Sequence, residues 1–574
     1  MDLAPLATVG GRLVPCHITV QSRNAPRSPV PEVRVRRVPP IAAPLLLFFV
    51  SLPTVARPQA ATRNETVILV TGQEPAAPIP TLLGSNVMAR DVSELLFLPL
   101  ARLGPSNVTV GDKGFEPVLA RKWSRRDSLT LVFELDPRAR WQDGVPVTAR
   151  DAALALNLAR DPAVDPSRAL LLRRVASATA EGDSQLVVRF REAYDEQLYD
   201  AVYHVSPLPA HLVDTIPAGA LAKSAFASAP VGNGPYRWSR RVPGQQIDLE
   251  ANDGFFLGRP GPRRITILVA GDAEARLNLL LSGGADAATN VGPVTNIARV
   301  QATPSLTIYP VPTLAVGSIL FNQRDPADLA RPHPILSDRD VRSAISMALD
   351  LTAMVRATFG TWAAVPVGPV PQLSWIRDPG ARPPAANPAG ARALLAARGW
   401  RDSDGDGVLD KGGRPLALGL NYPAQSAVRG QLAVLVQEQL RQVGIRVEIN
   451  RIDGPVWQER RNKGDFDLDF GSATMDPSPA GLTQSWSCAG RGGSNVAFYC
   501  NPAVDSLLAL AHRDRKKAVS LYRQAVRTIV QDVAAVFVYS PTDPFTVASR
   551  VRKVEIPPAY PLAALWRWNP GAAR

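Results

Sequence analysis

The feature that most constrains the fold is a helix, a tight turn and a strand that follow one another between residues 432 and 450. Apolar side chains recur at helical spacing from Leu432 to Val443, and Gly444 stands where a left-handed helix end is favoured. Residues 445–449 then alternate between apolar and polar side chains, which is typical of a strand. Such units build layered α/β proteins, so we expect an α/β fold.

Strand and helix patterns alternate in the same way along the chain after residue 60. A helix is expected from Thr148, whose hydroxyl caps the first turn, to Ala159, and Asp151 stands where it completes a capping box. A second helix is expected over residues 277–281, and we find no internal repeat. The strands that the pattern predicts are 66–70, 129–135, 186–190 and 265–269.

The first sixty residues differ from the rest of the chain. A basic cluster at residues 34–37 precedes an apolar run over residues 41–55, and small residues follow it. A basic region, a short apolar region and a stretch of small residues at the cleavage site are the parts of a secretory signal. We therefore interpret residues 1–60 as a leader that is disordered or cleaved, and the alternative is a disordered tail with a chance apolar patch.

Composition and charge are those of a soluble globular protein. The 574 residues are 46% hydrophobic and 20% charged, and after residue 60 no run of about 20 apolar residues predicts a membrane-spanning helix. The net charge is +13, and residues 1–60 contribute +5 of it through seven arginines against Asp2 and Glu32. The other arginines are scattered among acidic residues and are not clustered with aromatic ones, so nucleic-acid binding is not expected.

Two of the three cysteines, Cys488 and Cys500, stand close together with glycines between them. In an oxidising compartment this spacing suits a local disulfide. A metal site would need more ligands, and no histidine or second cysteine pair is near. The disulfide is the favoured interpretation, and it agrees with export.

The sequence displays no catalytic set. Its five histidines do not form the helical zinc-protease motif, and the nucleophile elbow and the phosphate-binding glycine loop are both missing. Asp402, Asp404 and Asp406 resemble the first half of a calcium loop, but Gly413 occupies the position of the bidentate glutamate. We therefore expect an Asp/Gly turn there, no metal, no cofactor, no catalytic residue and no enzymatic activity.

Several short segments follow one another in a fixed order between residues 65 and 570. Together they indicate a protein family more specifically than any one segment does alone. The segments are Trp141–Asp151 (WQDGVPVTARD), Val231–Tyr236 (VGNGPY), Leu249–Asn252 (LEAN), Leu281–Asp286 (LSGGAD), Phe321–Asn322, Val341–Asp350 (VRSAISMALD), Gly368–Pro371 (GPVP), Ala391–Trp400 (ARALLAARGW) and Gly493–Asn495 (GSN). This set resembles the bacterial extracellular solute-binding proteins of family 5, which serve dipeptide, oligopeptide and nickel importers.

The resemblance implies a two-lobe α/β fold of the periplasmic-binding-protein-like class II type, with an extra subdomain inserted in the first lobe. A ligand would sit in the cleft between the lobes, and hinge closure would bury it. The expected division assigns residues 65–108, 229–320 and 536–574 to the first lobe, 109–228 to the inserted subdomain and 321–535 to the second lobe.

The resemblance also implies where the ligand binds. Peptide-binding members have an acidic residue, which pairs with the peptide amine, three positions before an acidic-proline pair. Here Asp476-Pro477 is that pair and Ala473 takes the acidic position, while Ser426 stands where dipeptide binders have an arginine for the carboxylate. A longer or modified peptide, a sugar or a metal chelate is therefore favoured over a free dipeptide. The residues expected at the ligand are Tyr422, Gln425, Ser426, Ser472, Ala473, Thr474, Asp476, Trp486, Asn322 and Trp375. The aromatic ones among them either contact the ligand or pack in the core or at the rim.

The function implied by the resemblance is that of the substrate-binding component of an ABC importer. It would be a periplasmic or extracytoplasmic monomer that binds a peptide-like or other small polar solute and delivers it to a membrane permease and its ATPase. It would touch the membrane only through the permease. Two alternatives stay open: a secreted hydrolase of peptides or esters, which would need an arranged nucleophile and base, and a sensor that presents its ligand to a receptor.

Overall fold

The structure, a computed structural model, describes residues 62–75, 78–83, 86–558 and 560–571. The predicted leader, residues 1–60, lies outside this range. Throughout the described part of the chain, the helices are too short or too polar to cross a membrane. The described residues belong to one unit of the chain.

A large sheet organises the described residues. Its strands follow the order β20-β19-β21-β13-β22-β11-β1-β10-β9-β8, and β12 and β16 also pair with β22. These strands are β1 (Thr66–Thr71), β8 (Tyr236–Val242), β9 (Gln246–Ala251), β10 (Arg264–Val269), β11 (Ala287–Ala288), β12 (Leu306–Pro312), β13 (Ala315–Phe321), β16 (Ala363–Ala364), β19 (Ala417–Pro423), β20 (Arg446–Ile452), β21 (Leu468–Thr474) and β22 (Ala535–Ala548).

One end of the sheet forms a first lobe around β1, which runs parallel to both β10 and β11. Val67, Leu69 and Val70 are fully buried because the residues of β1 face packed layers on both sides. We call β1, β8–β12 and the second half of β22, with three helices, lobe I. The helices are α1 (Val87–Leu96), α7 (Ala273–Leu281) and α8 (Val294–Gln301).

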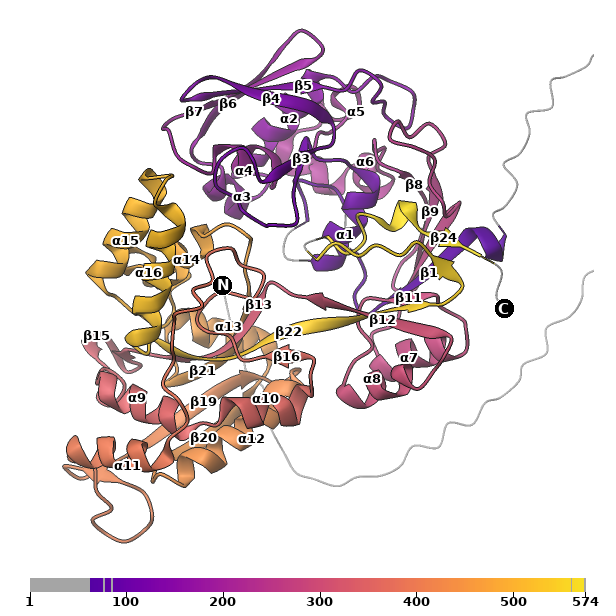
Figure 1. Ribbon diagram of the computed structural model, residues 1–574. Coiled ribbons are helices and arrows are strands. Elements are labelled where there is room, and N and C mark those ends of the chain that lie inside the picture. Colours follow the sequence, from indigo (N-terminus) through magenta and orange to yellow (C-terminus); the bar gives the residue numbers. More distant parts are fainter. Residues whose placement is uncertain (1–61, 76–77, 84–85, 559, 572–574) are drawn as a thin grey trace, which may run out of the picture. The chain divides into compact units, whose positions relative to one another are not determined.

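The other end forms lobe II, and it contains the helix–turn–strand unit that the sequence predicts. Helix α12 (Ala427–Arg441) ends before Gly444, which has a φ of +82°, and β20 then pairs in parallel with β19. Lobe II comprises β13, β16, β19–β21, the first half of β22 and helices on both sides (Figure 1). The remaining helices of lobe II are α9 (Arg339–Ala348), α10 (Leu351–Phe359), α11 (Pro388–Ala397), α13 (Gly454–Lys463), α14 (Ala480–Trp486), α15 (Pro502–Arg513) and α16 (Ala518–Gln531).

A separate four-stranded sheet, in the order β4-β5-β7-β6, lies within the residues expected for the inserted subdomain. Its strands are β4 (Ala120–Asp127), β5 (Thr130–Leu135), β6 (Val175–Glu181) and β7 (Gln185–Phe190). Helix α2 (Ala149–Ala159) begins with the predicted capping box, since the backbone N–H of Thr148 donates to Asp151 Oδ2 at 2.7 Å. We call this sheet, together with α2, α3 (Pro166–Leu171), α4 (Gln197–Val202), α5 (Ala210–Val213), α6 (Ala225–Ser228) and the segments that connect them, the insert.

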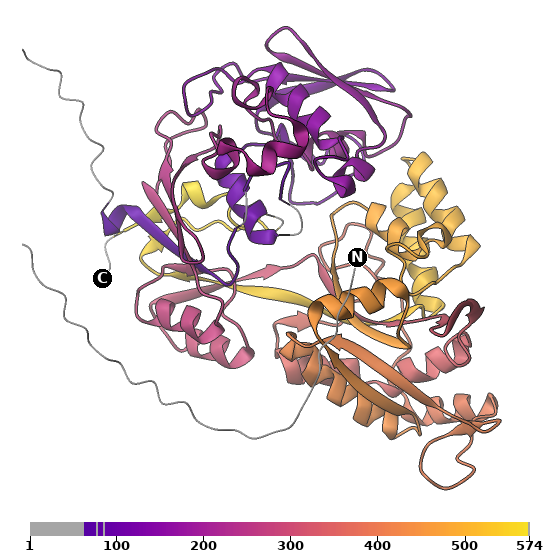
Figure 2. The same ribbon diagram turned by 180° about the vertical axis from the view of Figure 1, so that it is seen from behind.

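Strand β22 belongs to both lobes, and it can be followed from one to the other in two opposite views (Figures 1 and 2). Its first half pairs with β13 and β16, and its second half pairs with β11 and β12. β13 pairs with β21 along its whole length, which places residues 315–320 on the lobe II side. The division of the chain into lobes at residue 320 otherwise stays a prediction.

The predicted disulfide is confirmed, because Cys488 and Cys500 are bonded. It closes the loop that precedes α15. Short elements complete the described part of the chain: β2 (Ala101–Leu103), β3 (Phe115–Pro117), β14 (Arg324–Asp325), β15 (Asp328–Pro332), β17 (Asp410–Lys411), β18 (Arg414–Pro415), β23 (Val551–Arg552), β24 (Asn569–Pro570) and the 3-10 turns Arg63–Glu65, Ala218–Lys223, Cys488–Gly490 and Leu565–Arg567.

Candidate functional site

A cavity of about 240 Å³ lies in lobe I, beside the crossing strands β12 and β22. Residues that follow the carboxyl ends of the parallel strands β1 and β11 form one part of its wall, and the start of α1 forms another. Open α/β sheets bind ligands at the carboxyl ends of their strands. The cavity is lined by Thr71, Gly72, Gln73, Val87, Met88, Asp91, Arg276, Thr289, Asn290, Val311, Asp543, Phe545 and Pro561.

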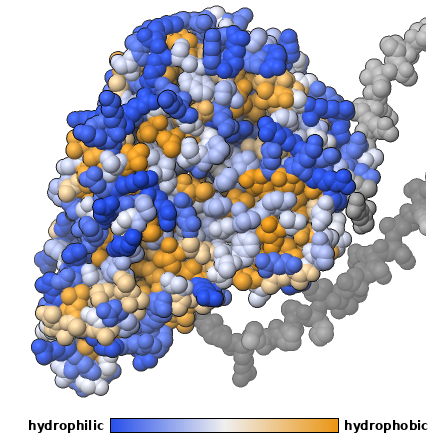
Figure 3. Space-filling model, viewed as in Figure 1, coloured by the Kyte–Doolittle hydropathy of each residue, from blue (hydrophilic) through white to orange (hydrophobic). Residues whose placement is uncertain are grey.

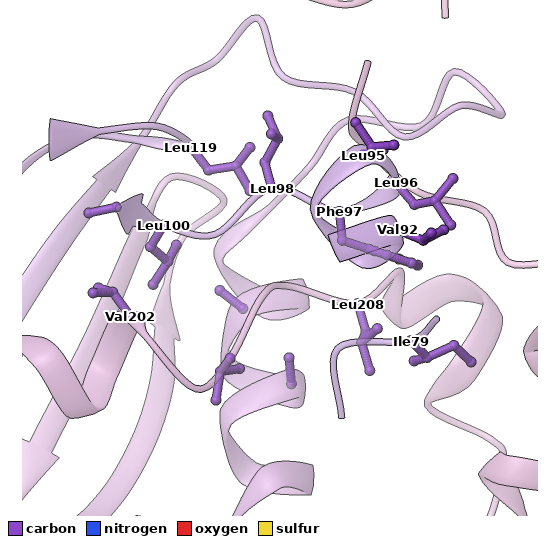
Figure 4. Close-up of a cluster of buried hydrophobic side chains, with 14 of the residues drawn as sticks. Ile79, Val92, Leu95, Leu96, Phe97, Leu98, Leu100, Leu119, Val202 and Leu208 are labelled. Carbon is purple, nitrogen blue, oxygen red and sulfur yellow. The ribbon is translucent and has the colours of Figure 1, made fainter. Parts of the chain in front are cut away.

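Helix α1 holds its part of the wall rigidly. Its N-cap residue Asn86 accepts a hydrogen bond from the backbone N–H of Ala89 at 2.8 Å, and the Asn86 amide donates to the carbonyl of Glu74 at 3.0 Å. The following turn of α1 packs into the core. Figure 4 shows that Val92, Leu95 and Leu96 lie there among apolar side chains from several other segments, including Ile79, Leu119, Val202 and Leu208.

Asp91 is the buried charge of this site. It lines the cavity with only 3% of its surface exposed, and its Oδ1 is buried without a hydrogen-bond partner. Burial raises the pKa of Asp91 to about 7; the charge of Arg90 opposes the rise, whereas those of Glu94 and Asp543 add to it. Unpartnered buried carboxylates are rare in folded proteins and concentrate at functional sites.

A second carboxylate, Asp543 of β22, lines the same cavity. Its Oδ1 accepts a hydrogen bond from the amide of Asn290 at 3.3 Å, and burial raises its pKa to about 6. Arg276 is the basic residue of the lining, but it donates to the backbone carbonyls of Ala270, Gly271 and Asn290 at 2.8–3.1 Å. The two carboxylates therefore share a cavity whose arginine is engaged elsewhere.

Next to the cavity, α1 and α4 present a wall of aromatic and basic side chains towards lobe II. The Tyr199 and Tyr203 rings stack at 4.5 Å, and the ring of His204 meets Tyr203 edge-on at 5.1 Å. Arg90 lies in this group, and its Nε is buried without a hydrogen-bond partner. The pKa of Arg90 is raised although burial opposes the rise, because Tyr203 and the nearby carboxylates favour its charge.

Asp476 of lobe II faces this wall. The carboxylate is exposed, and it raises the pKa of Arg90 while it opposes the burial that lowers the pKa values of His204, to about 4, and of Arg168. Asp476 is thus a predicted ligand residue that lies close to the guanidinium groups of Arg90 and Arg168.

The insert and lobe II meet directly through Glu196. Its Oε1 accepts a hydrogen bond from Thr109 Oγ1 at 2.5 Å and its Oε2 accepts one from Ser478 Oγ of lobe II at 3.0 Å. Burial raises the pKa of Glu196 to about 7, and the two hydroxyl groups partly offset the rise. Nearby, the rings of Tyr194 and His512 stack at 5.5 Å. We call the Thr109–Glu196–Ser478 group the Glu196 contact.

Two of the predicted ligand segments end neighbouring parallel strands of lobe II. Tyr422 belongs to β19, which Gln425 and Ser426 follow, and Ser472, Ala473 and Thr474 close β21. Tyr422 is buried in the lobe II core, whereas Gln425, Ala473 and Thr474 are exposed. Ser426 caps α12 by accepting from the backbone N–H of Arg429 at 3.5 Å. The ligand role of these residues stays a prediction.

The other three predicted residues lie in packed surroundings. Asn322 is fully buried, and its amide donates to the carbonyls of Gly464 and Phe466 at 2.9 Å. Trp375 donates to the carbonyl of Pro477 at 3.1 Å, and Trp486 packs edge-on against the rings of Tyr499 and Phe537. These contacts give each side chain a structural role, and the ligand contacts expected of them stay predictions.

The loop with three aspartates has the geometry of a turn. The carboxylate oxygens of Asp402, Asp404 and Asp406 lie within 4.8 Å of one another, and all three residues are exposed. Each already accepts a hydrogen bond from a backbone N–H of the same loop. The short hairpin of β17 and β18 follows, as the turn interpretation expects.

Sequence reasoning missed Asp91, Asp543 and Arg90. A signal for Asp91 was present, since it follows Met88 by three residues and precedes Leu95 by four, so it lies on the apolar side of α1. A charged residue in that phase is unusual for a helix that packs on a core. Asp543 gave no comparable signal, because the path of β22 between the lobes is a tertiary feature.

Comparison with known proteins assigns the chain to a family. The family described as bacterial extracellular solute-binding proteins, family 5, matches residues 114–494. The oligopeptide-binding protein AppA of Bacillus subtilis is 27% identical over 447 residues, which cover 77% of this chain and 80% of AppA.

Solved structures agree with this assignment at the level of the fold. The structure of Bacillus subtilis AppA in complex with a nonapeptide has a TM-score of 0.73 at 24% identity and covers 88% of this chain and 99% of its own. Campylobacter jejuni NikZ in complex with Ni(L-His) also has a TM-score of 0.73, at 19% identity, and covers 88% of this chain and 100% of its own. Both share the predicted two-lobe α/β fold. With a family match that spans most of the lobes and the insert, this chain belongs to the bacterial extracellular solute-binding proteins of family 5.

Proposed function

We propose that this protein is the substrate-binding component of an ABC importer, which captures a peptide-like solute and delivers it unchanged to a membrane permease. The observation that carries the proposal is the cavity at the carboxyl ends of β1 and β11, beside the strands that cross between the lobes. A solute bound there contacts the hinge strands, so its binding is coupled to the angle between the lobes.

Relatives support the peptide class. AppA of Bacillus subtilis is named an oligopeptide-binding protein, and its structure is that of a complex with a nonapeptide. The wall of tyrosines, His204 and Arg90 opposite Asp476 offers stacking surfaces and charged groups, which suit backbone amides and mixed side chains. The proposed protein acts outside the cytoplasm, as a monomer without turnover, and its partners are the permease and its ATPase.

In Figure 3, the hydrophobic residues of the face shown form several patches that hydrophilic residues interrupt. Larger continuous apolar patches mark sites of protein or membrane interaction or ligand-binding grooves.

Native mass spectrometry of the full-length chain, expressed in and purified from its host, tests the proposal. We expect a mass excess, release of peptides on denaturation, and recovery of the same peptides unchanged after incubation with the stripped protein. Wild-type protein that takes up none of the released solutes, or that converts them to new products, would refute the proposal.

A further inference from the structure

Three arginines gather on the insert, at the edge of its sheet where β6 begins and β7 ends. Arg191 donates from its Nε to the carbonyl of Arg173 at 3.2 Å, and the Arg160 guanidinium donates to the carbonyl of Ala176 at 2.8 Å. Burial and the charge of Arg191 lower the pKa of Arg160, so these positive charges lie close enough to repel one another. The hydrogen bonds that hold the three side chains go to backbone carbonyls and to an amide oxygen, and not to carboxylates.

Lobe II brings a fourth arginine to this group. The tip of the α15–α16 hairpin lies against the insert in two opposite views (Figures 1 and 2), and the ring of His512 from α15 stacks on Tyr194 of the insert at 5.5 Å. Burial lowers the pKa of His512 to about 4, and the charges of Arg174, Arg173 and Arg513 lower it further. Arg173 of the insert and Arg513 of α15 therefore lie on the two sides of this contact.

The acidic residues beside these arginines are already paired. Glu192 accepts a hydrogen bond from Arg174 Nε at 2.7 Å, and Asp514 pairs with Lys517 at 3.5 Å. The positive charge of the group is therefore only partly offset within the described chain. We define the arginine patch as the four guanidinium groups that form no ion pair with a described residue here, those of Arg160, Arg173, Arg191 and Arg513.

Two leucines flank the arginine patch, and they are the most exposed leucines of the described chain. Leu170 is 56% exposed, and its carbonyl accepts a hydrogen bond from Arg173 at 3.3 Å. Leu510 is 54% exposed and lies one turn before Arg513 on the same face of α15. A single exposed leucine is ordinary, but two beside unpaired guanidinium groups have the composition of a protein interface, where arginine is enriched around apolar side chains.

The chemistry of this surface favours a protein partner. Guanidinium groups pair bidentately with carboxylates, whereas an inorganic phosphate ion would engage them and leave the leucines exposed. A membrane surface needs a broad apolar face, but Val504, Leu508 and Ala511 of α15 are buried within lobe II. The surface therefore fits a segment that carries both carboxylates and an apolar side chain.

We propose that the arginine patch, with Leu170 and Leu510, is a docking surface for an acidic segment of a partner protein. The carboxylates of the segment pair with the guanidinium groups, and an apolar side chain of the segment covers the two leucines. The insert and lobe II each supply part of the surface, so it is complete only while the Glu196 contact holds them together. This inference goes beyond the proposed function, which concerns the solute and not a protein that binds the outside of the molecule.

The test measures binding of an acidic peptide. The probe is a fluorescein-labelled peptide of glutamates with two central leucines, and its control has glutamine in place of every glutamate. Fluorescence anisotropy with the full-length protein is measured at low ionic strength, because salt screens exposed charges. The variants are Arg173→Gln and Arg513→Gln. The matched controls are Arg140→Gln in the insert and Arg446→Gln in lobe II, which replace exposed arginines outside the patch.

We expect the dissociation constant of the glutamate peptide to rise about threefold in each patch variant and to stay unchanged in both controls. The glutamine peptide should bind about tenfold more weakly than the glutamate peptide. The double variant Leu170→Ser/Leu510→Ser should raise the dissociation constant about threefold as well.

A second comparison tests the joint origin of the surface. Ser478→Ala removes a hydrogen bond of the Glu196 contact and should weaken binding of the glutamate peptide, whereas Ser343→Ala removes a hydroxyl that donates within α9 and should not. Equal binding by these two variants, or a loss in only one of Arg173→Gln and Arg513→Gln, would overturn a surface shared by the insert and lobe II.

The remaining outcomes concern the partner. Equal affinity for the glutamate and glutamine peptides, or an equal loss in the control variants, overturns the inference. Vesicles of phosphatidylglycerol and phosphatidylcholine that bind the wild type through Arg173 and Arg513, when the glutamate peptide does not bind, would assign the patch to a membrane and overturn it too. Solute binding is unaffected by each of these results, because the patch residues do not line the cavity in lobe I.

Discussion

Ser478→Ala is expected to shift the protein from the arrangement in which the Glu196 contact is formed, which we call closed, towards an open one in which that contact is broken. Ser478 Oγ of lobe II donates to Glu196 Oε2 of the insert at 3.0 Å, and both residues are buried. The alanine variant leaves Glu196 with Thr109 as its remaining hydroxyl donor, on its own side of the contact. In an open arrangement water would hydrate the carboxylate, so the loss falls on the closed state alone.

The size of the effect follows from the charge of the acceptor. A hydrogen bond to a charged group contributes about 1.5–3 kcal/mol. Since each 1.4 kcal/mol changes an equilibrium constant tenfold, the ratio of closed to open molecules should fall about 10- to 100-fold. The pKa of Glu196 is raised to about 7, so the effect should be larger at pH 8, where the carboxylate is charged, than at pH 6.

Single-molecule energy transfer between dyes on the insert and on α15 measures the shift. Leu170→Cys and Leu510→Cys place the dyes at exposed positions. Ser506→Ala is the matched control, because its Oγ donates to the carbonyl of Pro502 within α15. If Ser478→Ala and Ser506→Ala give the same distribution of transfer efficiencies at pH 8, the Glu196 contact does not hold the lobes together and the reasoning is wrong.

Three further predictions concern stability. Replacing Cys488 and Cys500 by serine opens a loop with a sequence separation of 12 and should lower the free energy of unfolding by about 3 kcal/mol, measured by urea denaturation; an unchanged midpoint would contradict this. Gly317→Ala should destabilise lobe II by about 1–3 kcal/mol or more, because its Cβ would lie 2.2 Å from the Tyr539 ring, whereas Gly219→Ala meets nothing within 4 Å and serves as the control in thermal unfolding. Between pH 6.5 and 8.5 the free energy of unfolding should fall, because burial raises the pKa values of Asp91 and Glu196 to about 7 and of Asp200 to about 8, so the folded state binds more protons than the unfolded state; a rise over this window, in urea titrations at fixed salt, would contradict the assignment.

The pH window is set by the histidines as well as by the carboxyl groups. Burial lowers the pKa values of His204 and His512 to about 4, so their contribution to stability is lost as the pH falls below 6.5. Between pH 6.5 and about 7.5 the unfolded chain still binds some protons at these histidines, which partly offsets the fall; above about pH 7.5 they are neutral in both states, and the slope reports the buried carboxyl groups.

Local elements could be predicted from the sequence because their determinants are close together in the chain. The capping box at Thr148 and Asp151 and the glycine end of α12 depend on residues three or four positions apart. The strands β1, β5, β7 and β10 could be predicted for the same reason. Their apolar residues either alternate with polar ones or form a short continuous run, and both patterns are local. The disulfide joins cysteines only twelve positions apart, so its loop could close without knowledge of the fold.

The site depends on contacts between distant parts of the chain. Asp91 and Asp543 are more than 450 positions apart in the chain, and only the pairing of β22 with β11 and β12 brings the second of them to the cavity in lobe I. Glu196 and Ser478 meet in the same manner across the insert and lobe II. The packing of Trp375 and Asn322 could not be predicted either, because the sequence does not tell whether a tryptophan or an asparagine packs in the core or contacts a ligand.

The sequence by itself determined the α/β class, the resemblance to family 5 and the elements whose caps and periods are local. Tertiary structure alone decided which charges are buried without a partner, because burial and pairing depend on where strands from both ends of the chain meet. A carboxylate is solvated in the unfolded chain and becomes costly only when the fold removes its water, and this physical difference singles out Asp91.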